Sequence, residues 1–110
     1  MTGVKIIFDQ GTPAPLRHSL AGHSVATAFE QGWDKLQNGE LIRRAEAEGF
    51  NALITTDQNL GYQQNLQGRR LAILVLPTTS WPRIQRNVEK VSAALNSLKP
   101  GEYRELDFGG

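Results

Sequence analysis

Short, almost continuous apolar runs alternate with helical segments along this chain, and this alternation limits its fold more than any other feature. The runs at 4–8, 51–55 and 71–76 are rich in the aliphatic residues of strands covered on both faces, as in parallel sheets. Apolar residues within 40–48 and 82–98 instead repeat every three to four positions, the period of a helix packed on one side. The sequence therefore predicts a three-layer, Rossmann-like α/β domain with a mostly parallel sheet of about five strands.

The remaining elements have weaker signals. Asn38 is the expected N-cap of the helix at 40–48, and Gly49 is expected to end it. Segment 29–37 shows no clear period and is left unassigned. The other expected elements are, in chain order, a short helix at 14–20, a second strand within 23–28, a short helical turn at 60–66 and a final edge strand at 103–108.

Composition excludes several classes of function. A chain of 110 residues suits one domain, 1–110, and its 12 basic and 11 acidic residues create no strong overall field toward nucleic acid or membrane. The chain has no cysteine, which excludes disulfides, thiolate nucleophiles and thiolate metal sites. No apolar run approaches the length of a bilayer span, so a cytoplasmic protein with no membrane partner is expected.

Polar side chains follow the apolar runs at the points where the expected strands end. Asp9 follows the first run, Asp57 and Asn59 follow the run at 51–55, and Thr78 and Ser80 follow the run at 71–76. In parallel α/β sheets, ligands bind beyond the carboxyl ends of the strands. These groups, although distant in sequence, are therefore expected to converge on one edge of the sheet.

Oxygen ligands without histidine or cysteine suit hard cations such as Mg²⁺ or Mn²⁺, which serve phosphodiester hydrolysis by activating water and neutralising phosphate charge. The expected pocket is formed by Asp9, Asp57, Asn59 and Glu40, the last from the first turn of the helix at 40–48. Each residue also has a structural interpretation. Asp9 suits an Asx-turn, Glu40 suits the positive end of a helix, and Asp57 suits an N-cap.

Basic and hydroxyl side chains are candidates for substrate contacts. Arg69 and Arg70, together with Arg83 and Arg86, could form a local rim for a phosphate backbone, since such contacts position nucleic acid without reading its sequence. Solvated surface is the alternative interpretation of all four. The full set of expected substrate-binding residues is Thr56, Thr78, Ser80, Arg69 and Arg70.

The order of these elements resembles the minimal PIN-like domain family, which contains predicted toxin nucleases related to VapC. The resemblance covers nearly the whole chain and depends on residues 6–13 (IIFDQGTP), 38–42 (NGELI) and 53–60 (LITTDQNL). It implies a metal-dependent endoribonuclease, the toxin of a toxin–antitoxin pair, with Asp9, Glu40 and Asp57 as catalytic metal ligands for Mg²⁺ or Mn²⁺. Asn59 stands where many relatives have a second acid. An RNA substrate, a small antitoxin partner and homodimerisation are further expectations of the resemblance.

Two departures from the family pattern support an alternative function. Asn38 and Gly39 precede Glu40 where many relatives have an acidic pair, and Asn59 is neutral. Each missing carboxylate lowers the negative charge available to a cation. The alternative is a non-catalytic PIN-like module that binds RNA or protein. A third possibility is a receiver-like phosphoacceptor, because acids follow two of the strands and hydroxyls follow another, although Asp9 lacks the acidic neighbour usual in receivers.

Overall fold

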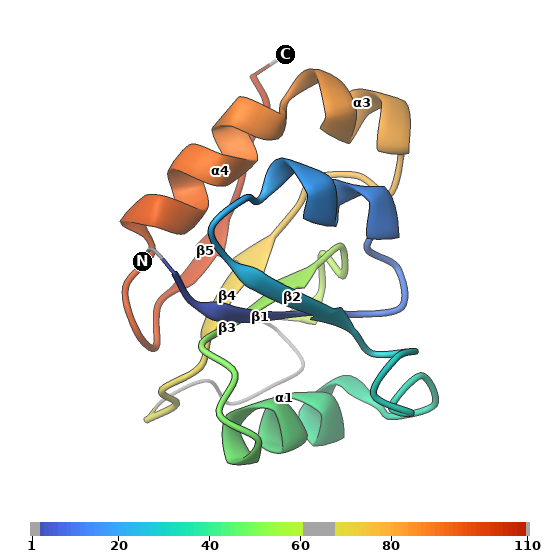
Figure 1. Cartoon of the computed structure of the whole chain (residues 1–110), viewed down its shortest axis with the longest axis vertical. Helices are drawn as coiled ribbons and strands as arrows, with labels where there is room; N and C mark the ends of the chain where they lie inside the picture. The colour runs from blue at the N-terminus through green and yellow to red at the C-terminus, as the bar shows by residue number, and fades with distance from the viewer. Residues whose placement is uncertain (1–2, 61–67, 110) are drawn as a thin grey trace.

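The computed structural model describes residues 3–60 and 68–109, and within them five strands form one parallel sheet in the order β2-β1-β3-β4-β5 (Figure 1). The strands are β1 (Lys5–Phe8), β2 (Ser24–Thr27), β3 (Ala52–Thr55), β4 (Ala72–Val75) and β5 (Tyr103–Glu105). The helices are the 3₁₀ helix η1 (Ala14–Ser19), α1 (Asn38–Ala47), α3 (Trp81–Arg86) and α4 (Val88–Ser97). The predicted α/β class with about five strands is confirmed.

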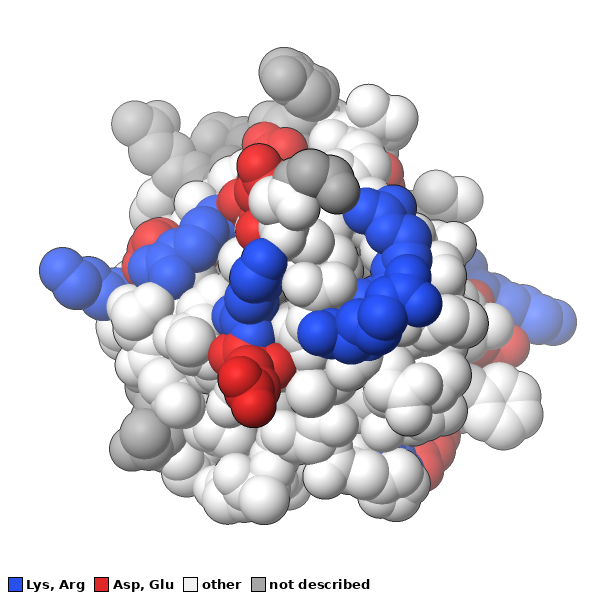
Figure 2. Space-filling model, turned by 90° about the horizontal axis from the view of Figure 1, so that it is seen from above, with Lys and Arg blue, Asp and Glu red and all other residues white. Residues whose placement is uncertain are grey.

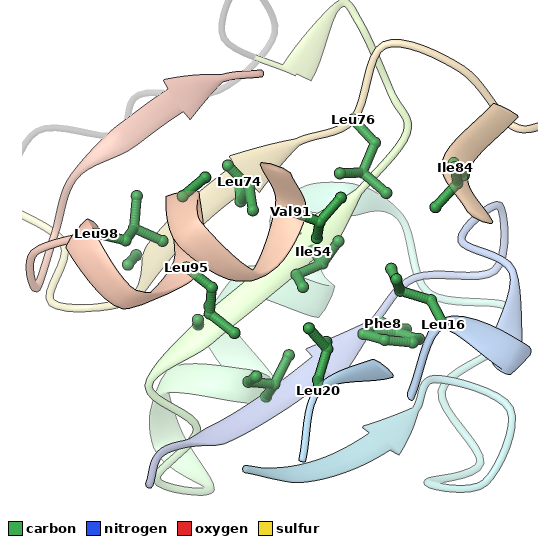
Figure 3. Close-up of a cluster of buried hydrophobic side chains, with 14 of the residues drawn as sticks. Phe8, Leu16, Leu20, Ile54, Leu74, Leu76, Ile84, Val91, Leu95 and Leu98 are labelled. Atoms are coloured by element: carbon green, nitrogen blue, oxygen red, sulfur yellow. The ribbon is translucent and has the colours of Figure 1, made fainter. Parts of the chain in front are cut away.

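Both faces of the sheet are covered, which explains why its central strands are apolar at every position. Phe8, Ile54 and Leu74 point toward η1, α3 and α4 (Figure 3), whereas the alternate residues Leu53 and Ile73 point toward α1. All five side chains are buried. Figure 1 shows the resulting layers, with α3 and α4 on one side of the sheet and α1 on the other.

The strand order creates a switch point between β1 and β3. From β1 the chain passes through η1 to β2 on one side, and then through α1 to β3 on the other side of β1. Neighbouring strands whose connections leave in opposite directions open a crevice at their carboxyl ends, where doubly wound folds bind ligands. The residues that directly follow β1 and β3 are therefore the ones placed at this crevice.

The helix predicted at 82–98 is wrong in one respect, because it is two helices that meet at Asn87. The Asn87 side chain donates a hydrogen bond of 2.8 Å from Nδ2 to the carbonyl oxygen of Arg83, and its backbone leaves the helical region at φ −122° and ψ 21°. Asparagine often competes in this way with the backbone ladder of a helix. Ser80 caps α3 by accepting a bond from the backbone N–H of Arg83.

The start of α1 also differs from the prediction. Asn38 was expected to be its N-cap, but Gln37 holds that position without a capping side chain, and Asn38 is the first residue of the helix. Gly49, at φ 81°, follows the C-cap and ends α1 as predicted.

Two further predictions concern the short segments. The helix expected at 14–20 is a 3₁₀ helix, and the turn expected at 60–66 lies outside the described residues except for the buried Leu60. None of the described helices has the length and apolar character that a bilayer span requires.

Candidate functional site at the carboxyl ends of β1 and β3

Asp9 is held by two threonine hydroxyls directly beyond the end of β1. Its Oδ1 accepts a bond of 2.6 Å from Thr12 Oγ1, and its Oδ2 accepts a bond of 2.5 Å from Thr55 Oγ1. Thr12 lies in the turn that follows β1, and its N–H also donates to the carbonyl oxygen of Asp9. Thr55 is the fully buried last residue of β3. The carboxylate is thus fixed by one group from its own turn and one from the neighbouring strand.

Asp57 is connected to Asp9 through the same Thr55 hydroxyl. That oxygen donates to Asp9 and accepts a 3.1 Å bond from the backbone N–H of Asp57. Oδ1 of Asp57 accepts a 2.9 Å bond from the backbone N–H of Asn59, which closes an Asx-turn. Oδ2 of Asp57 accepts a bond from Nδ2 of Asn38 at the start of α1. Thr55 therefore links the two acids that the sequence predicted to converge.

The residue that α1 contributes to this cluster is Asn38 rather than Glu40. Glu40 is exposed and forms an ion pair of 2.6 Å with Arg43, which lowers the pKa of the Glu40 carboxyl. Its partner is therefore a helix neighbour, and no hydrogen bond connects it to Asp9 or Asp57 among the described residues. The sequence signal at Asn38, a polar residue at a helix start, is equally typical of an N-cap and does not distinguish the two roles.

The threonine and serine residues that the sequence predicted to bind substrate follow the carboxyl ends of β3 and β4, and those after β4 form hydrogen bonds with nearby residues in the chain. Thr78 Oγ1 accepts a 3.0 Å bond from the backbone N–H of Ser80, and Ser80 Oγ caps α3. Thr56 lies against the turn after β1, because a Cβ added to Gly11 would come within 2.6 Å of its Oγ1. Asn59 contributes its backbone N–H to Asp57 and leaves its side chain exposed.

Arg69 and Arg70 lie near the amino ends of the strands, opposite to the carboxyl ends where Asp9 and Asp57 lie. They precede β4, and Arg70 lines a cavity of about 390 Å³ at the amino ends of the strands together with Glu46 and Asn51. Glu46 lies 3.9 Å from the Arg69 guanidinium. The structure therefore does not bring these two arginines to Asp9 and Asp57.

Arg83 and Arg86 occupy exposed positions on α3, a helix that packs against η1. Ile84 of α3 and Leu16 of η1 lie side by side in the core (Figure 3). Figure 2 looks onto the end of the molecule where α3 lies and shows Lys and Arg side chains gathered there, with acidic side chains beside some of them. Within the described residues neither arginine of α3 takes part in an ion pair.

A cavity of about 470 Å³ opens beside Asp9. η1 and the turn before it form one side, and the loop after β2 forms the other. Its lining residues are Asp9, Gln10, Gly11, Thr12, Pro13, Ala14, Arg17, Thr27, Phe29 and Glu30. The Asp9 carboxylate is therefore next to a space of the size that holds small ligands, which is typically ~300–1,000 Å³.

An ion pair joins the two sides of this cavity. The Arg17 guanidinium donates to both oxygens of Glu30, at 3.0 Å and 2.5 Å, and also to the carbonyl oxygen of Val25 at 3.4 Å. Glu30 accepts a further bond of 2.9 Å from the backbone N–H of Thr27. The Arg17 hydrogen bonds, with help from Thr27, lower the pKa of the Glu30 carboxyl to about 2.

This shift predicts how Glu30 stabilises the fold at different pH values. A carboxyl with a lowered folded-state pKa contributes its full stability above its usual pKa of 4.5, and the contribution is lost as the pH falls toward about 2. We expect Glu30→Gln to have a lower free energy of unfolding than the parent protein at neutral pH. This difference should shrink as the pH falls from 4.5 and should be gone near pH 2. Denaturant unfolding over a pH series measures it, with Glu105→Gln, at the exposed last position of β5, as the control. A difference that stays constant over the whole pH range would contradict this role of the ion pair.

The side chains at this edge are of the types that suit a hard cation. Asp9 and Asp57 carry carboxylates and Asn38 carries an amide oxygen, which are ligand types that Mg²⁺ or Mn²⁺ accepts while keeping several waters, whereas Asn59 contacts Asp57 only through its backbone N–H. Each carboxylate oxygen of Asp9 and Asp57 accepts one hydrogen bond from the described residues, and a carboxylate has about four lone-pair sites, so acceptor capacity remains on both acids. Among residues 3–60 and 68–109, no three acidic or histidine side chains are placed so that they could hold a metal ion together.

No protein-family model, curated protein or solved structure matches this chain. Its function must therefore be inferred from the chemistry of the residues around Asp9 and Asp57.

Proposed function

We propose that this protein is a metal-dependent endoribonuclease that hydrolyses RNA phosphodiester bonds at the carboxyl ends of β1 and β3. The observation that most supports the proposal is that the Asp9 carboxylate and the backbone N–H of Asp57 share the Thr55 hydroxyl at the switch point of the sheet. Doubly wound folds bind ligands at this position, and an open cavity lies beside Asp9. A toxin role with a small antitoxin partner and a possible homodimer belong to the same proposal, and the resemblance to PIN-like domains is their only support.

Asp9 and Asp57 would hold Mg²⁺ or Mn²⁺, and the amide of Asn38 would complete the protein's share of the ligands. The bound ion would supply a water nucleophile and neutralise charge on the phosphate. The protein's own contribution is to orient the acids. Thr12 and Thr55 fix Asp9, and Asn38 and the Asn59 N–H fix Asp57, so neither carboxylate must be reorganised when substrate binds.

Metal dependence is the direct test of the proposal. Purified protein should cleave a fluorescently labelled single-stranded RNA in Mg²⁺ or Mn²⁺, and excess EDTA should stop the reaction. Activity should return when Mg²⁺ is added in excess over the chelator. Cleavage that continues at the same rate in EDTA would overturn the metal-dependent mechanism.

Because Glu40 is paired with Arg43, substitutions of Asp9 and Glu40 should reduce cleavage to different extents. We expect Asp9→Asn to reduce cleavage far more than Glu40→Gln, because Asp9 is in the hydrogen-bonded cluster and Glu40 is on the surface of α1. Glu40 has no hydrogen bond to Asp9 or Asp57 among the described residues, so Glu40→Gln should cleave at a rate close to that of the parent protein. Initial cleavage rates at saturating Mg²⁺ measure this order. Equal losses in the two variants would instead return Glu40 to the metal site that the sequence predicted.

A non-catalytic binding module is the second candidate function. It is favoured by the loss of acidic groups from the site, since α1 contributes the neutral Asn38 to Asp57 and Glu40 is paired with Arg43 instead. This candidate predicts binding of RNA or of a protein partner without turnover in Mg²⁺ or Mn²⁺. Detectable metal-dependent turnover of RNA that Asp57→Asn removes would exclude it.

A further inference from the structure

Phe29 is a large hydrophobic side chain that the described part of the chain leaves exposed, at 70% of its surface. It lines the cavity that contains Asp9. The other aromatic residue of its loop, Trp33, is buried at 8% exposure and packs edge-on against Phe50 with ring centroids 6.0 Å apart. The loop thus buries one aromatic ring and presents another to solvent beside the candidate active site.

Hydrogen bonds hold the loop in this arrangement on both sides of Phe29. The Ala28 N–H donates to the carbonyl oxygen of Phe8 at 2.8 Å, and the Trp33 N–H donates to the carbonyl oxygen of Ala28 at 2.8 Å. Thr27 and Glu30 also exchange reciprocal bonds of 2.9 Å and 3.1 Å between side chain and backbone. The loop therefore presents the exposed ring beside the cavity, where it is available to a ligand.

We propose that Phe29 is a stacking platform for an unpaired nucleobase of the RNA, whose adjoining phosphodiester lies at Asp9. This inference rests on the proposed ribonuclease function and specifies its substrate as single-stranded. A base paired within a duplex has both faces covered by its neighbours, whereas an unpaired base can stack on an aromatic ring whatever its sequence.

The surroundings of Phe29 favour a base over an apolar protein surface. Gln10 and Thr27 line the same cavity, together with Arg17 and Glu30 paired to each other, so the cavity that the exposed ring lines also carries polar groups that suit the edges of a base or a ribose. Protein-binding patches are usually contiguous apolar areas of several hundred Å². A single ring beside a carboxylate and polar side chains instead provides one flat contact and several hydrogen-bonding positions.

Binding of a labelled single-stranded RNA of about twelve nucleotides tests the proposal. Fluorescence anisotropy is measured in EDTA and again in Ca²⁺, with a duplex RNA of the same length for comparison. Phe29→Leu keeps the apolar side chain but removes the aromatic face, and we expect single-strand binding to weaken roughly five- to 150-fold. Phe29→Trp should bind at least as tightly as the parent protein. Gln31→Ala, an exposed position in the same loop, should bind as the parent protein does.

The outcomes separate stacking from catalysis because binding is measured without turnover. Single-strand binding that depends on the aromatic ring supports the platform even if Mg²⁺-dependent cleavage is never found, in which case the ribonuclease proposal alone fails. Equal single-strand affinities of Phe29→Leu and the parent protein would overturn the platform even if cleavage is found. An equal loss for duplex and single strand, or no binding of the single strand in either buffer, would also overturn it.

Discussion

Replacing Asp57 by asparagine is expected to reduce metal-dependent RNA cleavage by at least about a hundredfold, the usual scale for losing one preorganised electrostatic group. The substitution keeps the shape of the side chain and removes its negative charge. The amide oxygen can still accept the Asn59 N–H that closes the turn after β3. The fold should therefore survive, and the loss should appear in catalysis.

Asp107→Asn is a matched control for this substitution. Oδ1 of Asp107 accepts the backbone N–H of Gly109 at 2.9 Å, which is the same local turn that Asp57 makes with Asn59, but Asp107 lies beyond β5 and away from the cavity. Initial cleavage rates and thermal unfolding should be measured for both variants. We expect Asp107→Asn to match the parent protein in both measurements.

Two results would contradict the role given to Asp57. Cleavage by Asp57→Asn at a rate close to that of the parent protein would remove this residue from the chemistry. Covalent labelling of Asp57 by a small phosphodonor would instead support the receiver-like alternative. Receivers share the strand order β2-β1-β3-β4-β5 and also have an acid after β3.

The sheet could be predicted from the sequence because its strands are buried on both faces. Residues 71–76 are apolar throughout and residues 52–54 are apolar between Asn51 and Thr55, a pattern typical of strands between two layers of helices. The convergence of Asp9 and Asp57 then followed from chain direction, since parallel strands have their carboxyl ends at one edge. The pairing order was not predictable in the same way, because it depends on which side of β1 each crossover packs.

The helix contribution to the site could not be predicted, because it depends on where α1 begins. Consecutive residues of a helix are about 100° apart, so Asn38 and Glu40 point in directions that differ by roughly 200°. With Asn38 as the first residue of α1, its side chain reaches Asp57 and the side chain of Glu40 turns to Arg43. The resemblance at 38–42 depends on residue types, and it cannot tell whether residue 38 or residue 40 faces Asp57.

The loop after β2, which forms one wall of the cavity beside Asp9, could not be predicted for a different reason. Segment 29–37 has no period of either helix or strand, and its conformation depends on tertiary bonds such as that of Arg17 with Glu30. These two residues are 13 positions apart, and no local pattern pairs them. Phe29 gave no sign that it would be exposed, because an isolated aromatic residue in an unassigned segment is more often buried.

The Thr55 hydroxyl, which connects the two acids, gives the second large expected effect. Thr55→Val has nearly the same shape and should lower the free energy of unfolding by about 1.5–3 kcal/mol, the scale of a hydrogen bond to a charged group. In the variant, Oδ2 of Asp9 and the backbone N–H of Asp57 both lose their partner at a position that is fully buried. Denaturant unfolding at neutral pH measures the change, and Thr79→Val, at an exposed position, should stay within about 0.5 kcal/mol of the parent protein.

A double-mutant cycle separates the loss of this bond from a general defect in packing. Thr55→Val and Asp9→Asn are combined, and their coupling energy should be at least about 0.5 kcal/mol, because Thr55 donates directly to the charge that Asp9→Asn removes. Thr55→Ser keeps the hydroxyl and loses only a methyl group, so it should retain more cleavage activity than Thr55→Val. Additive losses in the cycle, with equal activity in the two Thr55 variants, would mean that the residue fills space without positioning Asp9. Coupling together with a selective loss of cleavage in Thr55→Val would identify the buried hydroxyl as the group that holds both acids in place for the reaction.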